Sequence, residues 1–223
     1  STRLKGSLEA QLAAVHDGDV DVLVGTQMIA KGHDFRRMTL VAAVSADNAL
    51  YSSDFRAPER LFALLMQAAG RAGRDAAMGA RSQMWVQTWN PRHPLFAALA
   101  QHDYAAFANN QLKDRESAGL PPFAHLALLR AEAKDAAVAR GFLQAATEAA
   151  AALPQSAAVT IYPPVPPAVQ RVADVERVQM LMESASRTAL QQLLNALQPE
   201  LLRLRGAHRG LTRWAIDVDP LAI

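Results

Sequence analysis

The first half of the chain alternates short apolar runs with amphipathic stretches. Leucine and valine recur at helical spacing over residues 4–16, which predicts an amphipathic helix. Nearly continuous apolar runs at 21–25 and 39–44 predict parallel strands that are covered on both faces. A helix from about 59 to 71 and a third strand over 83–88 complete the pattern. Strands that alternate with helices indicate an open α/β sheet.

The second half of the chain predicts a separate α+β domain. A helical stretch opens at Pro94 and is stopped near residue 118 by a Leu-Pro-Pro sequence. Beyond it the predicted order is strand, helix, strand, strand, helix, strand, which is typical of a ferredoxin-like sandwich. These elements are expected over residues 125–132, 135–153, 158–162, 177–183, 186–204 and 212–218.

The composition indicates a folded protein and limits its chemistry. Hydrophobic residues make up 51% of the chain and charged residues 20%, which is enough apolar surface for a core. No run approaches the ~18 apolar residues of a membrane span, and no basic-then-apolar leader opens the chain. Cysteine is absent, which excludes disulfides, thiolate zinc sites and a cysteine nucleophile within the chain. We expect a soluble, cytoplasmic protein without a membrane partner.

The charge is nearly balanced. The 23 basic and 21 acidic residues leave a net charge of +2, so a sequence-independent coating of nucleic acid is not expected. Any contact with DNA must come from individually placed arginines and backbone amides.

Two glycine–arginine pairs form the most informative segment, Gln67-Ala-Ala-Gly70-Arg71-Ala-Gly73-Arg74. On a helix, Gln67, Arg71 and Arg74 would share one face. Two guanidinium groups beside bare glycine backbone suit a polyphosphate, and an arginine offered across a cleft can stabilise a transferring phosphoryl group. The alternative is a helix end that is capped by glycine and carries solvated arginines.

A second segment, residues 24–35, leaves a predicted strand through Gly-Thr and returns through lysine, glycine and an acid. Ligands bind at the ends of parallel strands in open sheets. Thr26 and nearby amides could hold a nucleic-acid phosphate, and Asp34 could accept from a ribose hydroxyl. Alternatively, Thr26 caps a helix and Asp34 shapes a turn.

Together the two segments resemble motifs V and VI of superfamily 2 helicases. GTQMIAKGHDF at 25–35 and DNALYSSDFRAPERLFALLMQAAGRAGR at 47–74 resemble the PriA family of replication-restart helicases in particular. The likeness continues through the second half of the chain. There it rests on LPPF at 120–123, the proline bend at 163–167, SRTALQQ at 186–192 and WAIDVDP at 214–220.

The resemblance implies a domain organisation. Residues 1–93 would be the later part of a RecA-like second helicase lobe, 94–118 a connecting helix and 119–223 a C-terminal α+β domain. The parent protein would be an ATP-dependent 3′-to-5′ DNA helicase that remodels and restarts stalled replication forks and loads the primosome. Such a protein would reside in the bacterial cytoplasm and associate with the nucleoid.

The resemblance also implies roles for residues of the two motifs. Arg74 would reach the γ-phosphate of ATP, and Arg71 and Gln67 would support nucleotide sensing and coupling between the lobes. Asp34 and Gly32 would lie on the nucleotide side.

Thr26, Gln27 and Lys31 would contact the tracked DNA strand. His33 matches the motif without an assigned role.

The chain departs from the family pattern in what it lacks. It contains no Gly-x-x-x-x-Gly-Lys-[Ser/Thr] loop and no Asp-Glu-x-His box. ATP and Mg²⁺ would therefore be bound mainly by another lobe, and zinc would belong to the parent protein and not to this segment. We expect a C-terminal fragment that neither hydrolyses ATP nor unwinds DNA by itself.

The expected partners are forked or single-stranded DNA, other primosome proteins and the acidic tail of single-stranded DNA-binding protein. Arg187 and Gln191, four residues apart at the start of a predicted helix, form a plausible carboxylate site that the resemblance connects with that tail. The alternative is an exposed helix face. Arg171 and Arg177 could contact DNA, but solvated surface roles are favoured for both.

Aromatic and imidazole side chains are expected to be structural. Core packing is favoured over base stacking for Trp85, Trp89 and Trp214. His102 and His125 lack the spacing of metal ligands.

Two other functions stay open. A stand-alone module could bind DNA or a protein tail without catalysis, as the missing phosphate loop would suggest. A different superfamily 2 translocase would also carry the Gln-x-x-Gly-Arg-x-Gly-Arg pattern, although GHDF, DFRAPER and the matching second half argue against it.

Overall fold

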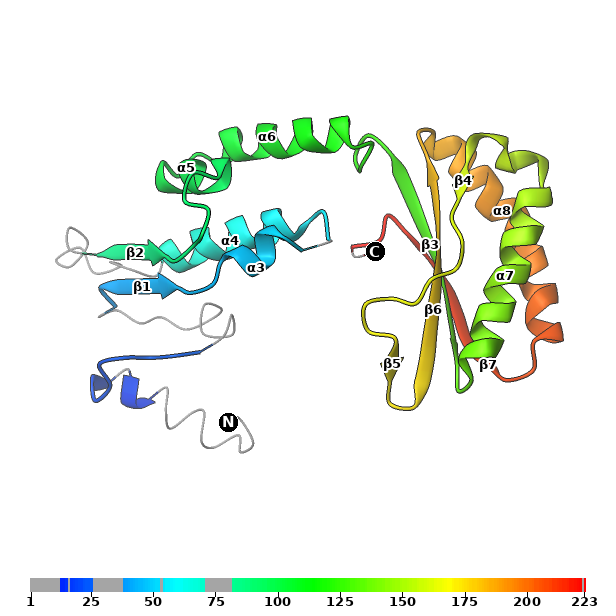
Figure 1. The fold of residues 1–223 in the computed structure, drawn as a ribbon, viewed down its shortest axis with the longest axis horizontal. Coiled ribbons are helices and arrows are strands. Elements are labelled where there is room, and N and C mark those ends of the chain that lie inside the picture. Colours follow the sequence, from blue (N-terminus) through cyan, green and yellow to red (C-terminus); the bar gives the residue numbers. More distant parts are fainter. Residues whose placement is uncertain (1–12, 16, 26–37, 53, 71–81, 222) are drawn as a thin grey trace. The chain divides into compact units, whose positions relative to one another are not determined.

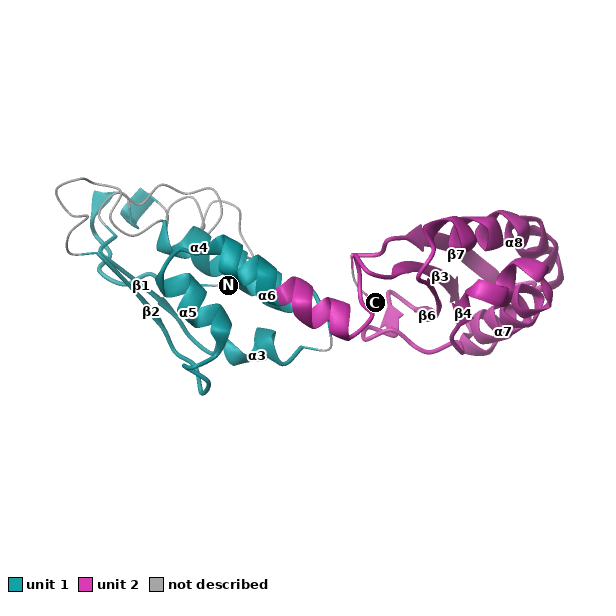
Figure 2. Cartoon of the chain, turned by 90° about the horizontal axis from the view of Figure 1, so that it is seen from above, with its two compact units in different colours: residues 1–110 teal, residues 111–223 magenta. Residues whose placement is uncertain are grey.

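The computed structural model describes residues 13–15, 17–25, 38–52, 54–70, 82–221 and 223. The chain divides into two compact units, residues 1–110 and residues 111–223 (Figure 2). No helix in the described ranges combines the length and the apolar character that crossing a bilayer requires.

The first unit is a short parallel α/β arrangement. Strand β1 (Leu40–Ala43) pairs in parallel with β2 (Gln83–Val86), with Leu40 opposite Gln83 and Ala43 opposite Val86. The helices of this unit are α3 (Asp47–Leu50), α4 (Ala57–Ala69), α5 (Pro94–Ala100) and α6 (Tyr104–Ser117) (Figure 1). The last of them continues into the second unit (Figure 2). The predicted strands at 39–44 and 83–88 and their parallel pairing are confirmed.

The core of the first unit joins helices to one face of the strand pair. Leu61, Phe62 and Leu65 of α4 are buried together with Leu95 of α5. The Phe62 ring stacks on Phe107 of α6, with ring centroids 4.1 Å apart. One face of α4 is thereby fixed in the core.

The apolar run at 21–25 is not a strand, so that prediction is wrong. Residues 22–25 have no regular secondary structure, and Val22 and Val24 are 75% and 88% exposed. A strand needs a neighbour that takes its backbone hydrogen bonds, and both described strands of this unit pair with each other. The predicted helix at 4–16 lies mostly outside the described residues, of which 13–15 are helical.

The helical stretch predicted over 94–118 consists of two helices, α5 and α6. His102 lies between them with φ at 54°, a left-handed conformation that a continuous helix cannot contain. The Asp103 carboxylate then accepts the Ala106 N–H at 2.8 Å, as a residue that caps a helix N-terminus does.

The second unit is a ferredoxin-like α+β sandwich, as predicted. Its antiparallel sheet has the strand order β4-β6-β3-β7, to which the short β5 adds at β6. Both long helices cover the same face of this sheet (Figure 1). The elements are β3 (His125–Ala133), α7 (Ala136–Ala152), the 3₁₀ turn η2 (Pro154–Ala158), β4 (Thr160–Ile161), β5 (Arg171–Val172), β6 (Val175–Ser184), α8 (Arg187–Ala207) and β7 (Leu211–Val218).

Alternation of large and small side chains lets the helices lie close to the sheet. Alanine occupies several fully buried positions on β3 and α7, among them Ala131 and Ala146. Leucines of α8 and Phe142 of α7 fill the space between these small side chains. Such interdigitation at native density is what makes the core sensitive to the loss of a side chain.

Irregular chain runs beside β6 and covers part of the opposite face of the sheet. The segment 162–170 runs beside β6, where Val165 and Gln179 exchange two backbone hydrogen bonds of 2.8 Å. Four of its nine residues are proline. Proline cannot donate to a further strand, so this segment closes the edge of the sheet beside β6.

Burial along α8 predicts a contrast between two of its leucines. Leu197 is fully buried and Leu202 is 59% exposed. Leu197→Ala should lower the free energy of unfolding of the second unit by about 2–5 kcal/mol because it leaves a cavity, whereas Leu202→Ala should change it by less than about 0.5 kcal/mol. Urea unfolding followed by Trp214 fluorescence, with Trp85 and Trp89 replaced by phenylalanine, measures both. Equal effects of the two substitutions would contradict the described packing.

Candidate functional site

Most residues that the sequence singles out for nucleotide and DNA contact lie outside the described residues. These are Thr26, Gln27, Lys31, Gly32, His33, Asp34, Arg71 and Arg74. The described chain ends at Gly25 and resumes at Met38 around the first segment, and ends at Gly70 and resumes at Ser82 around the second.

The segment with two glycine–arginine pairs begins on α4. Gln67 is exposed on this helix, on the side away from the core residues Phe62 and Leu65. The helix ends at Ala69, two residues earlier than predicted, and the Gly70 N–H bonds to the Met66 carbonyl at 3.0 Å. The predicted helix face was to carry Gln67, Arg71 and Arg74. Of these three residues, only Gln67 lies among the described residues.

The carboxyl ends of β1 and β2 lie at the same edge of the parallel pair, where ligands bind in open sheets. The pairing continues past the strands, since the Gln87 N–H bonds to the Ala43 carbonyl at 2.9 Å. The Gln87 side-chain oxygen accepts the Ser45 N–H at 2.8 Å, and Ser45 adopts a left-handed φ of 59°. The chain leaves both strands through a hydrogen-bonded corner.

The Asp47 side chain connects the chain segments that follow β1 and β2. Its carboxylate accepts the Thr88 hydroxyl at 2.7 Å and the Trp89 N–H at 3.0 Å, although only 9% of the residue is exposed. The Thr88 hydrogen bond is the largest influence on the pKa of Asp47 and lowers it, burial opposes this, and the Trp89 N–H adds to the lowering. The charged form of Asp47 therefore holds the residues after β2 against the start of α3.

The DFRAPER segment has a structural role in starting α4. Asp54 accepts the Arg56 N–H at 2.9 Å and forms an ion pair with Arg60 one turn into the helix. Burial raises the pKa of Asp54, but the hydrogen bonds from Arg60 and from Arg56 outweigh it, so the pKa lies below its usual value. Pro58 lies in the first turn, where its missing N–H costs nothing.

Sequence reasoning missed Asp47 and Asp54. For Asp47 the available signal was position, because polar residues shortly after a strand lie at the edge of an open sheet where ligands bind. The hydroxyl of Thr88, just beyond β2, pointed to the same edge.

The first turn of α8 carries the predicted carboxylate site. The Ser186 hydroxyl caps the helix by accepting the Ala189 N–H at 3.3 Å. The Arg187 side chain is 68% exposed, and its Nη2 lies 3.7 Å from the Asp219 carboxylate. Gln191 lies one turn further along the helix and is half-buried. The fold thus brings SRTALQQ and WAIDVDP together through Arg187 and Asp219.

Arg171 and Arg177 both have acidic neighbours. Arg171 pairs with Asp174 at 2.7 Å and with Glu176 at 3.6 Å. Arg177 lies 3.4 Å from Glu132, its cross-strand partner in the β3–β6 register. Both arginines are therefore ion-paired within the second unit.

The tryptophans divide into two classes, and the core role predicted for two of them is wrong. Trp85 and Trp89 are 60% and 87% exposed. Met84 and Val86 turn toward the core of the first unit, so Trp85 faces the other side of the strand pair. Trp214 is half-buried against the second core, with its ring 6.4 Å from Phe142.

The histidines belong to no metal cluster in the part of the chain that the structure describes. His102 lies between α5 and α6, and His125 opens β3.

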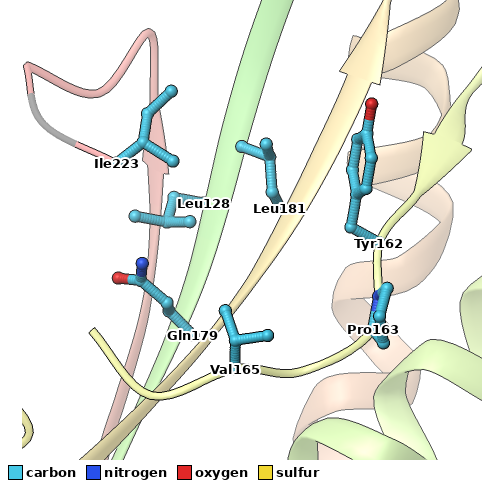
Figure 3. A pocket seen from close by; sticks show the side chains of 7 residues that line it. All are labelled: Leu128, Tyr162, Pro163, Val165, Gln179, Leu181 and Ile223. Carbon is cyan, nitrogen blue, oxygen red and sulfur yellow. The ribbon is translucent and has the colours of Figure 1, made fainter. Parts of the chain in front are cut away.

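A small apolar pocket of about 250 Å³ lies on the sheet face that the helices leave open (Figure 3). Leu128 and Leu181 form its floor, Val165 and Pro163 of the proline bend form one side, and Ile223 lies opposite. No sequence motif predicts this pocket, because the residues that line it come from segments far apart in the chain.

Two family profiles match the chain. The helicase conserved C-terminal domain matches residues 3–76, and the primosomal protein N C-terminal domain matches residues 116–221.

Curated relatives match over nearly the whole chain. The replication restart protein PriA of Haemophilus influenzae is 40% identical over 99% of this chain, that of Synechocystis sp. 37% over 100%, and that of Treponema pallidum 36% over 98%. The chain spans only 29%, 26% and 32% of the length of these relatives.

Each half of the chain thus matches its own domain profile, and the PriA proteins contain both halves in the same continuous alignment. The chain belongs to the PriA family of replication restart proteins and corresponds to the C-terminal region of that family, with a helicase C-terminal domain followed by a PriA C-terminal domain.

Proposed function

We propose that the chain is the C-terminal part of an ATP-dependent 3′-to-5′ DNA helicase that remodels stalled replication forks, restarts them and loads the primosome. The observation that carries the proposal is the continuous match to PriA proteins over 99% of the chain. By itself the chain would be inactive, because it lacks a phosphate-binding loop. Residues 1–93 would form the later part of the second helicase lobe, 94–118 a helical connection and 119–223 the C-terminal domain.

The nucleotide site would be completed from this chain by Gln67, Arg71, Arg74, Gly32 and Asp34. ATP and Mg²⁺ would supply the free energy of translocation and be bound mainly by the other lobe. The described part of α4 fits this role, since one face is fixed in the core while Gln67 is exposed on the other. A helix held in this way can present groups to a nucleotide without reorganisation.

Thr26, Gln27 and Lys31 would contact the DNA strand. Amide and hydroxyl donors together with one lysine suit the phosphate backbone, which positions a nucleic acid without reading its sequence. This would let the motor move along any strand.

In the second unit, Arg187 and Gln191 would hold the acidic tail of single-stranded DNA-binding protein. Support comes from the exposure of Arg187 and from its neighbour Asp219, which shows that a carboxylate reaches this guanidinium. At 3.7 Å in an exposed position, that pair contributes little, so a tail carboxylate can compete with Asp219.

Arg74→Ala in the full-length protein should lower DNA-stimulated ATP turnover about 10³-fold or more, as the loss of other arginine fingers does. DNA binding should be largely retained, because Arg74 addresses the nucleotide. Arg140→Ala, an exposed arginine on α7, is the matched control and should turn over ATP normally. Near-normal ATP turnover by Arg74→Ala would contradict the assignment of Arg74 to the nucleotide site.

Arg187→Ala should weaken binding of a peptide with an acidic C-terminus about 10- to 100-fold, since a charge-assisted hydrogen bond contributes about 1.5–3 kcal/mol. Asp219→Asn removes the competing carboxylate and should strengthen binding up to about 5-fold. Arg205→Ala, an exposed arginine in the last turn of α8, serves as the control. Fluorescence anisotropy of the labelled peptide measures all three, and equal affinities for Arg187→Ala and Arg205→Ala would place the tail elsewhere.

A further inference from the structure

An exposed aromatic turn lies at the edge of the parallel strand pair where both strands end. Directly after β2 comes Gln87-Thr88-Trp89-Asn90-Pro91-Arg92-His93, which contains one arginine and no acid. Trp89 is 87% exposed, and its ring contacts no other ring in the described residues. So exposed a tryptophan stabilises the fold of this chain little, and the described residues leave most of its apolar area uncovered.

The backbone of this turn is fixed although the indole is exposed. Asp47 holds the Trp89 N–H and the Thr88 hydroxyl, and the Asn90 N–H bonds to the Thr88 hydroxyl oxygen at 3.0 Å. The His93 N–H bonds to the Asn90 carbonyl at 3.0 Å. A rigid platform loses less conformational entropy on binding than a mobile loop does.

A second aromatic ring belongs to the same corner. Tyr51, directly after α3, is 71% exposed, and its hydroxyl accepts a hydrogen bond from the Asn90 side-chain amide at 3.2 Å. This bond connects the turns that follow β1 and β2. Two exposed rings and one amide thus belong to one corner at the carboxyl edge of the pair.

Arg92 supplies the cation. Its side chain is exposed and forms no ion pair with any residue in the described ranges. A free guanidinium three residues from a free indole is the combination that single-stranded nucleic acids recognise, since bases stack on the ring and phosphates pair with the cation.

We propose that Trp89, with Tyr51 and Arg92, forms a base-stacking site for single-stranded DNA at the carboxyl edge of β1 and β2. Trp89 stacks on a base, Arg92 pairs with a phosphate, and Asp47 is a positioning residue that holds the platform. The site is sequence-tolerant because every base has a flat face. It rests on the proposed DNA-helicase function and adds a contact outside the predicted DNA-binding segment at residues 26–31.

The test measures how tightly two kinds of single-stranded DNA bind to the full-length protein and to its variants at two tryptophans. An oligothymidine and an abasic strand of equal length differ only in their bases. Trp89→Ala should weaken binding of oligothymidine about 5- to 150-fold, which corresponds to about 1–3 kcal/mol per stacked base. It should leave binding of the abasic strand unchanged, and Trp89→Phe should retain most of the affinity for oligothymidine.

Trp85→Ala is the matched control. Trp85 is 60% exposed on the same strand segment, but its indole N–H bonds to the Gln83 side chain at 3.0 Å and it lies before the carboxyl edge. Its replacement should change neither affinity by more than about 2-fold, in keeping with a surface substitution. Arg92→Ala should weaken the binding of oligothymidine and of the abasic strand equally and reduce the salt dependence of binding by about one counterion.

A direct signal comes from tryptophan fluorescence. Oligothymidine should quench the emission of the unmodified protein, and most of that quench should be absent in Trp89→Phe and present in Trp85→Phe. Unchanged affinity of Trp89→Ala for oligothymidine, or an equal loss for the abasic strand, would overturn the stacking site.

Unwinding assays on the same protein separate the two proposals. If the unmodified protein unwinds forked DNA and the Trp89→Ala variant unwinds it equally well, the proposed function is retained and the stacking site is excluded. A protein that never unwinds DNA would remove the proposed function on which the stacking site rests.

Discussion

The parallel pairing of β1 with β2 is the constraint on which the first unit depends. Because the two strands run in the same direction, both chain segments that follow them leave at one edge, where backbone groups need new partners. Asp47, Gln87 and Ser45 provide these partners. The same edge carries the exposed rings of Tyr51 and Trp89, and α4 is fixed by its core beside the strand pair.

In the second unit, the two faces of the sheet are covered in different ways. Two helices bury one face of an antiparallel sheet, while the proline bend and the last residues cover part of the other. The tightly packed face determines stability, whereas part of the other face and the Arg187 side chain at the start of α8 are exposed.

Sequence patterns predicted much of this architecture because periodicity reports burial. The strands and helices of the second unit were predicted almost to their ends, except for the two-residue strand β5 and the 3₁₀ turn η2, since each predicted strand has its pairing partners within the chain. The run at 21–25 failed because an apolar stretch does not reveal whether a partner strand is beside it. Trp85 and Trp89 failed for a related reason, since residue type alone does not tell which face of a strand pair is covered. Asp47 was missed because its hydrogen bonds join residues about forty positions apart.

We propose that this chain acts as one part of a longer helicase. An immunoblot of source cells with an antibody against residues 119–223 tests this. Since the chain spans 29% of its Haemophilus relative, we expect a band at roughly three times the 24.1 kDa of the chain. A single band near 24.1 kDa would contradict it, because no phosphate-binding loop would then accompany Arg74 in the same polypeptide.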